Sequence, residues 1–221
     1  MKLVEEQRKS NKKEFCFRFS FAFIIPMISI LYPILNRYRG IVYVQKLPID
    51  NIIPFIKVFI LPYVSWYPYV AIFLIVLCFV DKNNYFKLIG GLCIGMLTCY
   101  LIYFFYPTYV QRPTVEEKDI FDKIVLWVYG RDNPFNCWPS IHVLNSYLVA
   151  LYTSLSDKLN SFIKSVSITI STLIILSTMF VKQHYLSDVV AGLLLGTIIY
   201  LAIEIFVKLK VNNRIENTLT D

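Results

Sequence analysis

The stretch DVVAGLLLGTIIYLAIEIFV, residues 188–207, decides the fold class. Between Asp188 and Glu204 it carries no charged side chain. About 20 consecutive apolar residues are enough to cross the roughly 30 Å of hydrocarbon in a bilayer. Within lipid, a helix satisfies every backbone polar group of such a segment internally. The stretch therefore predicts a membrane-spanning helix.

Similar apolar runs precede it along the chain, separated by short charged or polar segments. These runs cover residues 17–35, a segment ending near 80, 85–106, 140–155 and 161–181. The whole chain is 57% hydrophobic, above the roughly 45–50% that is usual for soluble domains. We therefore expect an all-α fold, a polytopic membrane bundle of about six transmembrane helices.

The boundaries of these runs predict three regions. Residues 1–16 form a basic tail, residues 17–208 the membrane domain, and residues 209–221 a second tail. The first run is interpreted as a retained helix, because no small-residue cleavage pattern precedes its end.

Three further local features follow from residue patterns. Residues 41–57 mix apolar and polar positions, which is typical of the membrane interface. Aromatic residues near the start of the second run are interpreted as interfacial anchors; they are Trp66, Tyr67 and Tyr69. In the polar loop 107–139, apolar residues from Phe121 to Val128 follow a helical period and predict a short surface helix ending at Gly130.

The net charge of +7 comes from residues spread along the chain. Many of the lysines and arginines flank apolar runs, where such residues fix topology and meet anionic headgroups. We therefore exclude a nucleic-acid partner and expect a multi-pass cell-membrane protein with both tails in the cytoplasm. The five cysteines are interpreted as small buried hydrophobes and one loop thiol, Cys137, because no disulfide framework fits an odd number in apolar runs.

Alternation of the spans brings distant polar residues to one membrane face. The third run exits near Arg112, the fourth starts near His142, and the fifth exits near His184, four residues before Asp188. These residues should converge, on the extracytoplasmic face if the N-terminus is inside. We expect the two imidazoles to lie within about 10 Å of each other.

Such a group suits phosphoryl transfer. Arginine offers a planar fork of donors for phosphate oxygens. A neutral imidazole is a nucleophile when a carboxylate takes up its other ring proton, and a second, protonated imidazole can protonate the departing oxygen. His184 with Asp188 fits the first role, and His142 fits the second.

The segments carrying these residues resemble the motifs of the type 2 phosphatidic acid phosphatase superfamily. The run from Pro139 to His142 matches its P-S-x-H motif, and Ser177, His184 and Asp188 match its S-R-x5-H-x3-D motif. The resemblance covers about residues 85–205 and is greatest to the branch of inositol phosphorylceramide synthases and small bacterial relatives.

The resemblance implies a six-helix fold and a metal-independent reaction without a cofactor, through a phosphohistidine. It implies that His184 is the nucleophile, Asp188 its orienting partner and His142 the general acid and later the base. Arg112 and Ser140 would bind phosphoryl oxygens.

Two positions depart from the superfamily pattern. Phe105 stands where the first motif has a lysine, and Thr178 stands where the third motif has an arginine. Two cationic phosphate ligands are therefore missing. Lys182 is a candidate to replace one of them, although on a helix it would point away from His184.

Each of these residues also has a simpler interpretation. Either histidine could be an interfacial residue that only forms hydrogen bonds, and Asp188 could be a helix N-cap. Arg112 and Lys182 could extend their charged ends to the membrane surface. Two histidines in matching motifs on one face favour the catalytic interpretation.

The sequence leaves three functions open. The first is a lipid phosphatase that hydrolyses a lipid phosphate or diphosphate ester at the outer leaflet. The second is a lipid phosphotransferase that moves a phosphorylated headgroup to an acceptor alcohol. The third is a catalytically silent membrane scaffold or transporter. For the enzymes we expect a membrane lipid phosphate as substrate and no obligate protein partner.

Overall fold

The computed structural model describes residues 13–220, with side chains for residues 13–213. Its described part is helical and contains only two isolated β-bridges, Tyr43 with Thr108 and Tyr109 with Phe135. Of the predicted tail at residues 1–16, residues 1–12 lie outside the described residues, and residues 13–16 already belong to the first helix.

Within the described residues, five helices are long and apolar enough to cross a membrane by length and composition. They are Lys13–Leu35, Lys57–Val80, Lys82–Phe105, Ser161–Phe180 and Leu186–Asn213. The prediction of an all-α membrane bundle is confirmed. Each of these helices coincides with one of the predicted apolar runs.

Two of these spans are interrupted near proline residues. The first contains η1 (Phe21–Phe23), α2 (Ile24–Ser29) and α3 (Leu31–Leu35). The second contains η3 (Lys57–Phe59), α4 (Ile60–Val64) and α5 (Trp66–Val80). Because proline lacks a backbone N–H, it removes a helical hydrogen bond and produces such breaks.

The remaining predicted run forms α8 (Ile141–Ser154), which lies at the centre of the bundle. Its 14 residues extend over only about 21 Å, less than the hydrocarbon thickness. It nevertheless needs no lipid-facing surface, because it packs against α5, α6 (Lys82–Phe105), α9 (Ser161–Phe180) and α10 (Leu186–Thr220). Val143, Leu144, Leu148 and Val149 on α8 are fully buried.

Glycines allow α10 and α6 to approach α8 closely. A Cβ on Gly192 would lie 2.8 Å from the Ser140 carbonyl oxygen, and one on Gly196 would lie 2.9 Å from the Tyr147 ring. The G-x-x-x-G spacing is therefore a packing motif between helices.

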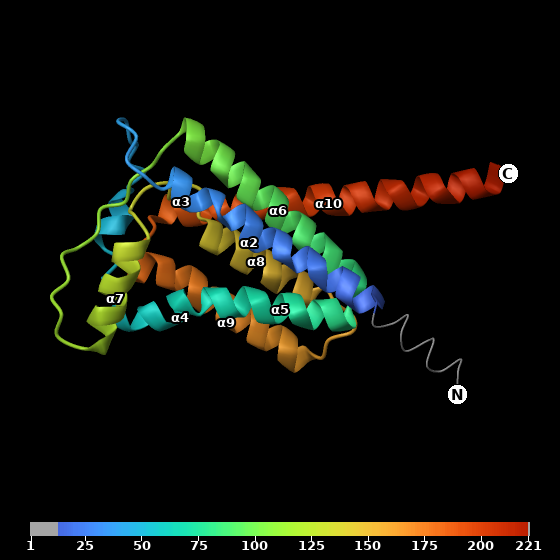
Figure 1. Ribbon diagram of the computed structural model, residues 1–221, viewed down its shortest axis with the longest axis horizontal. Helices are drawn as coiled ribbons and strands as arrows, with labels where there is room; N and C mark the ends of the chain where they lie inside the picture. Colours follow the sequence, from blue (N-terminus) through green and yellow to red (C-terminus); the bar gives the residue numbers. More distant parts are fainter. Residues whose placement is uncertain (1–12, 221) are drawn as a thin grey trace.

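The loops at one end of the bundle position the site. They contain η2 (Pro48–Asn51) and α7 (Ile120–Arg131). The Asp119 side chain caps α7 by accepting the backbone N–H groups of Phe121 and Asp122. Figure 1 shows α7 and these connections on the left, and the far end of α10 on the right.

Three predicted details were wrong. The surface helix continues through Gly130 to Arg131. The last helix starts at Leu186 and continues to Thr220, well past residue 207, because no glycine or proline follows Gly196. Of the predicted interfacial anchors only Tyr67 is exposed; Tyr69 is buried, and Trp66 is partly buried against the site.

Candidate active site

The two histidines converge as alternation of the spans predicts. His142 lies in the first turn of α8, and His184 lies in the loop between α9 and α10. Their ring centroids are 6.0 Å apart, within the expected 10 Å. A phosphoryl group bound between them could contact both rings.

Asp188 orients His184. Its Oδ2 atom lies 3.2 Å from the His184 Nδ1 atom and also accepts the backbone N–H of Tyr185 at 2.9 Å. Asp188 is 1% exposed, and His184 is 8% exposed. A carboxylate in this position favours the tautomer with its proton on Nδ1, in which the lone pair is on Nε2.

A backbone hydrogen bond joins the two motifs directly. The Ser140 N–H donates to the Asp188 carbonyl oxygen at 3.1 Å. The Ser140 hydroxyl is fully buried and caps α8 by accepting the Val143 N–H at 3.3 Å. The start of α8 is therefore fixed relative to the His184 loop, and its free backbone N–H groups favour an anion.

The His184 loop owes its shape to the end of α9. The Thr178 carbonyl accepts the backbone N–H groups of both Gln183 and His184, at 2.9 and 3.1 Å. Lys182 has a φ of 52°, the left-handed conformation that commonly ends a helix. This turn directs His184 back toward α8.

Arg112 lies beside this loop. Its guanidinium donates to the Asp132 carbonyl at 2.6 Å and to the Gln183 side chain, and lies 4.5 Å from the centre of the Tyr129 ring. Its Nε atom is buried without a partner. Arg112 thus reaches the residue next to His184, but it is not among the residues that line the cavity described below.

Lys182 points elsewhere. Its ammonium donates to the backbone carbonyls of Asp50 and Ile53, and burial lowers its pKa. These contacts attach the segment around η2 to the His184 loop. A phosphate-binding role for Lys182 remains a prediction, and its contacts favour a structural role.

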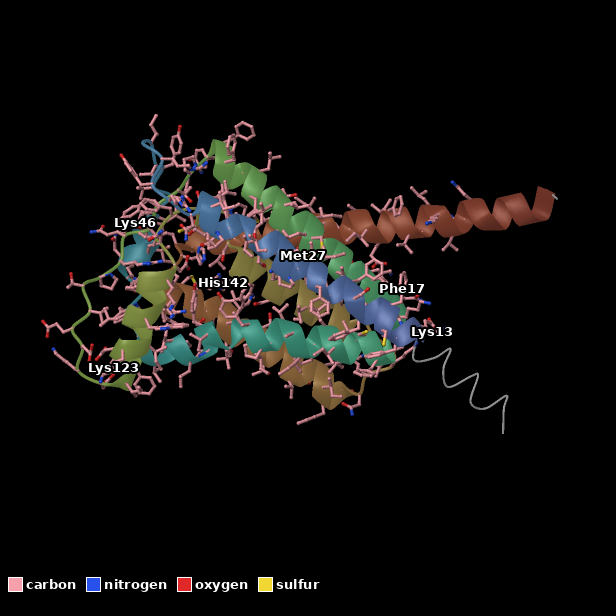
Figure 2. All side chains as sticks on the ribbon, in the orientation of Figure 1. Lys13, Phe17, Met27, Lys46, Lys123 and His142 are labelled. Carbon is pink, nitrogen blue, oxygen red and sulfur yellow. The ribbon has the colours of Figure 1, made fainter. Side chains whose placement is uncertain are left out.

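A cavity of about 460 Å³ lies in front of both histidines. Its lining residues come from the first span and from α4 through α8. Most of them are apolar or aromatic, including Tyr32, Tyr67, Tyr100, Tyr103 and Trp127. Figure 2 shows His142 between the helices of the first and second spans.

Three residues of this cavity were not predicted as part of the site. Tyr63 and Trp66 place their rings 4.8 and 4.5 Å from the His142 ring. Asp132 accepts hydrogen bonds from Tyr32 at 2.8 Å and Asn36 at 2.7 Å. Only the packing of distant segments brings these residues to the histidines, so no local motif could identify them.

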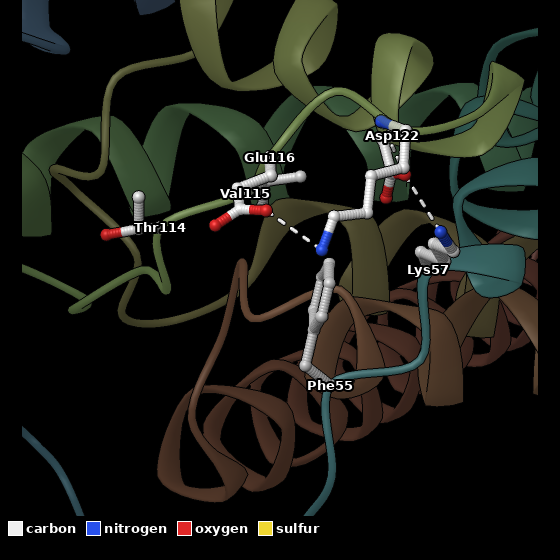
Figure 3. Close-up of a pocket in the computed structure, with 7 residues that line it drawn as sticks. Phe55, Lys57, Thr114, Val115, Glu116 and Asp122 are labelled. Carbon is white, nitrogen blue, oxygen red and sulfur yellow. Dashed lines mark hydrogen bonds and ion pairs between the residues drawn. The ribbon is translucent and has the colours of Figure 1, made fainter.

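A separate hollow of about 420 Å³ lies in the loops and shares no lining residue with the cavity. There Lys57 forms ion pairs with Asp119 at 2.6 Å and Asp122 at 2.8 Å, as Figure 3 shows for Asp122. The Lys57 ammonium lowers the pKa of Asp119. These charges fasten the loop to the second span.

The described residues contain no group of three or more histidine, cysteine or acidic side chains that could hold a metal ion. The metal-independent reaction expected from the sequence remains a prediction.

Comparison with protein families gives the same assignment as the motifs. Residues 108–211 match the family model of the PAP2 superfamily. The matched segment contains every predicted site residue, from Arg112 to Asp188.

Two individual proteins are similar to this chain. An uncharacterized protein of Methanocaldococcus jannaschii is 30% identical over 122 residues, which are 54% of this chain and 48% of the relative. This chain thus matches about half the length of that relative. The crystal structure of Aquifex aeolicus LpxE aligns with a TM-score of 0.46 and 18% identity, over 79% of this chain and 92% of LpxE.

Proposed function

We propose that this protein is an integral membrane lipid phosphatase that hydrolyses a lipid phosphate or diphosphate ester through a phosphohistidine. The observation that carries the proposal is the 6.0 Å separation of the two imidazole rings, with Asp188 bound to His184. The match of residues 108–211 to the PAP2 superfamily supports it. The aromatic cavity beside both rings suits a lipid substrate.

In the first step, the Nε2 atom of His184 attacks phosphorus. A P–N bond forms while the ester P–O bond breaks, and His142 transfers its proton to the departing oxygen. Asp188 stabilises the positive charge that develops on His184. Arg112 and the N-terminus of α8 at Ser140 would bind the phosphoryl oxygens.

In the second step, His142, now neutral, takes a proton from water. The water oxygen attacks phosphorus, the P–N bond breaks, and inorganic phosphate leaves. His142 is then protonated again and His184 is neutral, so the enzyme returns to its starting state.

The proposed location of this site is the extracytoplasmic face of the cell membrane. The dense basic charge of residues 1–16 favours a cytoplasmic N-terminus. The histidines and the start of the first span would then lie at opposite membrane faces.

The test is phosphate release by purified protein from phosphatidic acid or a polyprenyl diphosphate, in the presence of a chelator. We expect His184→Ala to abolish release, and Asp188→Asn to reduce kcat by roughly 10²- to 10⁴-fold, as in other carboxylate–histidine pairs. Lys158→Ala, an exposed change at the opposite end of α8, should leave release unchanged.

His142→Ala provides a direct view of the intermediate. Without the base that activates water, a phosphoryl group on His184 should accumulate as an acid-labile adduct when a substrate with a good leaving group is supplied. If the substrate is cleaved only when an alcohol is added, and the phosphoryl group is recovered on that alcohol, the protein is a phosphotransferase and not a phosphatase. If no substrate reacts and vanadate does not bind, a silent scaffold or transporter would explain the chain better.

A further inference from the structure

The ring of His142 lies between two aromatic rings from the second span. The Tyr63 ring stacks on it, with centroids 4.8 Å apart and planes inclined by 29°. The Trp66 ring is 4.5 Å away and inclined by 50°. We call Tyr63 and Trp66 the aromatic clamp.

Both rings of the aromatic clamp lie closer to the His142 ring than the His184 ring does. No hydrogen bond joins that ring to another described residue, whereas His184 has Asp188 as a direct partner. A general acid must nevertheless hold a proton and its positive charge in a mostly apolar cavity. Some neighbouring group has to stabilise that cation.

Aromatic faces can supply this stabilisation. A cation within about 6 Å of a ring centroid is attracted by the negative face of the ring, most strongly for tryptophan, and the attraction grows where water is excluded. Both clamp rings lie within this distance of His142. Tyr63 is 3% exposed, so its ring is well shielded from water.

The carboxylate of Asp132 contacts the aromatic clamp through the hydroxyl group of Tyr63. The Tyr63 hydroxyl lies 3.5 Å from the Oδ2 atom of Asp132. The Oδ1 atom of Asp132 is held by Tyr32 and Asn36, at the end of the first span. A hydrogen bond from the Tyr63 hydroxyl to Asp132 would make the Tyr63 ring richer in electrons and thus a better partner for a cation on its face.

We propose that Tyr63 and Trp66 are positioning residues that hold the His142 ring toward His184 and stabilise its protonated form, with Asp132 reinforcing Tyr63. This inference rests on the proposed function, because it assigns an acid role to His142. The clamp residues act through His142 and take no part in bond making.

Other ionisable groups line the same cavity as His142 and also affect the pH at which it titrates. Those that line the cavity are Tyr32, Tyr63, Tyr67, Tyr100, Tyr103, Arg131, Asp132 and His184. Asp188 stands behind His184, and Arg112 lies behind the Asp132 backbone. Among the described residues lining the cavity, Asp132 is the only carboxylate.

The test is the pH dependence of kcat/KM for Trp66→Leu and Tyr63→Leu. Removing a clamp ring favours the neutral imidazole, so the alkaline limb of the profile should move to lower pH by about 0.5 to 1 unit. Trp66→Phe keeps a ring beside His142, so its pH profile should stay close to that of the unmodified protein. Tyr63→Phe keeps the ring and loses only the contact to Asp132, so its shift should be smaller than that of Tyr63→Leu.

Leaving-group dependence adds a second readout. An alkyl phosphate needs a proton on its departing oxygen, whereas a nitrophenyl phosphate barely does. Clamp variants should therefore lose more kcat/KM on the alkyl ester than on the nitrophenyl ester. Trp127→Leu removes a cavity ring outside the aromatic clamp, so it can change KM but should not move the pH profile.

His142→Ala distinguishes a failure of the proposed acid role of His142 from a failure of the clamp inference alone. If His142→Ala lowers kcat/KM, which reports the first step alone, much more for the alkyl ester than for the nitrophenyl ester, the acid role stands. Unshifted pH profiles in both leucine variants would then overturn the clamp alone. If His142→Ala affects both esters equally or neither, the acid role fails, and the clamp inference fails with it.

Discussion

Lys182 occupies a backbone position that favours glycine. Its φ of 52° is left-handed, which costs a non-glycine residue roughly 1 kcal/mol or more. Its ammonium offsets this cost by binding the carbonyls of Asp50 and Ile53. The ammonium group of Lys182, a predicted phosphate ligand, thus connects the His184 loop to the segment around Asp50.

We therefore expect Lys182→Gly to retain kcat/KM within about threefold. The glycine relieves the backbone strain while the two carbonyl contacts are lost, so the change in unfolding free energy should stay within about 1 kcal/mol. Lys182→Met keeps the strain and loses the contacts, so it should unfold at a lower temperature than Lys182→Gly. A loss of kcat/KM above about 30-fold in both folded variants would instead identify Lys182 as a phosphate ligand.

His142 and Trp66 illustrate what residue patterns reveal at a site and what they hide. Short motifs identified His142, His184 and Asp188, since their chemistry requires fixed residue types at fixed spacing. Trp66 looked like an interfacial anchor, because aromatic residues at the start of a span usually are. Its contact with His142 depends on how α5 packs against α8, which local sequence does not encode.

Close packing of α10 on α8 links stability to the site. Gly192 meets the backbone oxygen of Ser140, the residue whose N–H binds the Asp188 carbonyl. A side chain at Gly192 cannot be accommodated by a rotamer change, because its neighbour is backbone. At Gly95 a Cβ would meet the ends of the Leu144 and Ile199 side chains, which can move.

Gly192→Ala should therefore destabilise the protein by about 1–3 kcal/mol, typical of overpacking, and should lower kcat by displacing Ser140 relative to Asp188. Gly90→Ala in α6 is the matched control, because its Cβ would meet nothing within 4 Å. Better helix propensity should make that variant neutral or slightly more stable. Thermal unfolding in detergent measures both, and equal stability of the two variants would contradict the packing argument.

Hydrophobic runs predicted the helices well, because the membrane demands both apolar length and internal hydrogen bonding. They predicted the ends less well. Apolar content falls after Val207, although the residues that follow still favour a helix, so α10 continues to Thr220. α8 shows the opposite case, because it is too short to span the membrane. It is accommodated because other helices of the bundle surround it.

The bundle as a whole places α7 and the histidine loops at one end and the turn at residues 155–160 at the other. Alternation of the spans alone predicted that the histidines share an end, and their 6.0 Å separation confirms it. Which end faces the cytoplasm depends on charge bias, which is modest here and resides mostly in residues 1–16.

Cysteine labelling in intact cells tests this orientation. In a Cys16→Ser background, Glu116→Cys places a thiol on the loop before α7, where the side chain is 76% exposed, and Lys158→Cys places one at the opposite end. Burial raises the pKa of the native Cys137 thiol well above its usual range, so that thiol should stay unreactive near neutral pH. An impermeant maleimide should label Glu116→Cys directly and Lys158→Cys only after permeabilisation. The reverse pattern would place both histidines at the cytoplasmic face, and a substrate in the outer leaflet would then be ruled out.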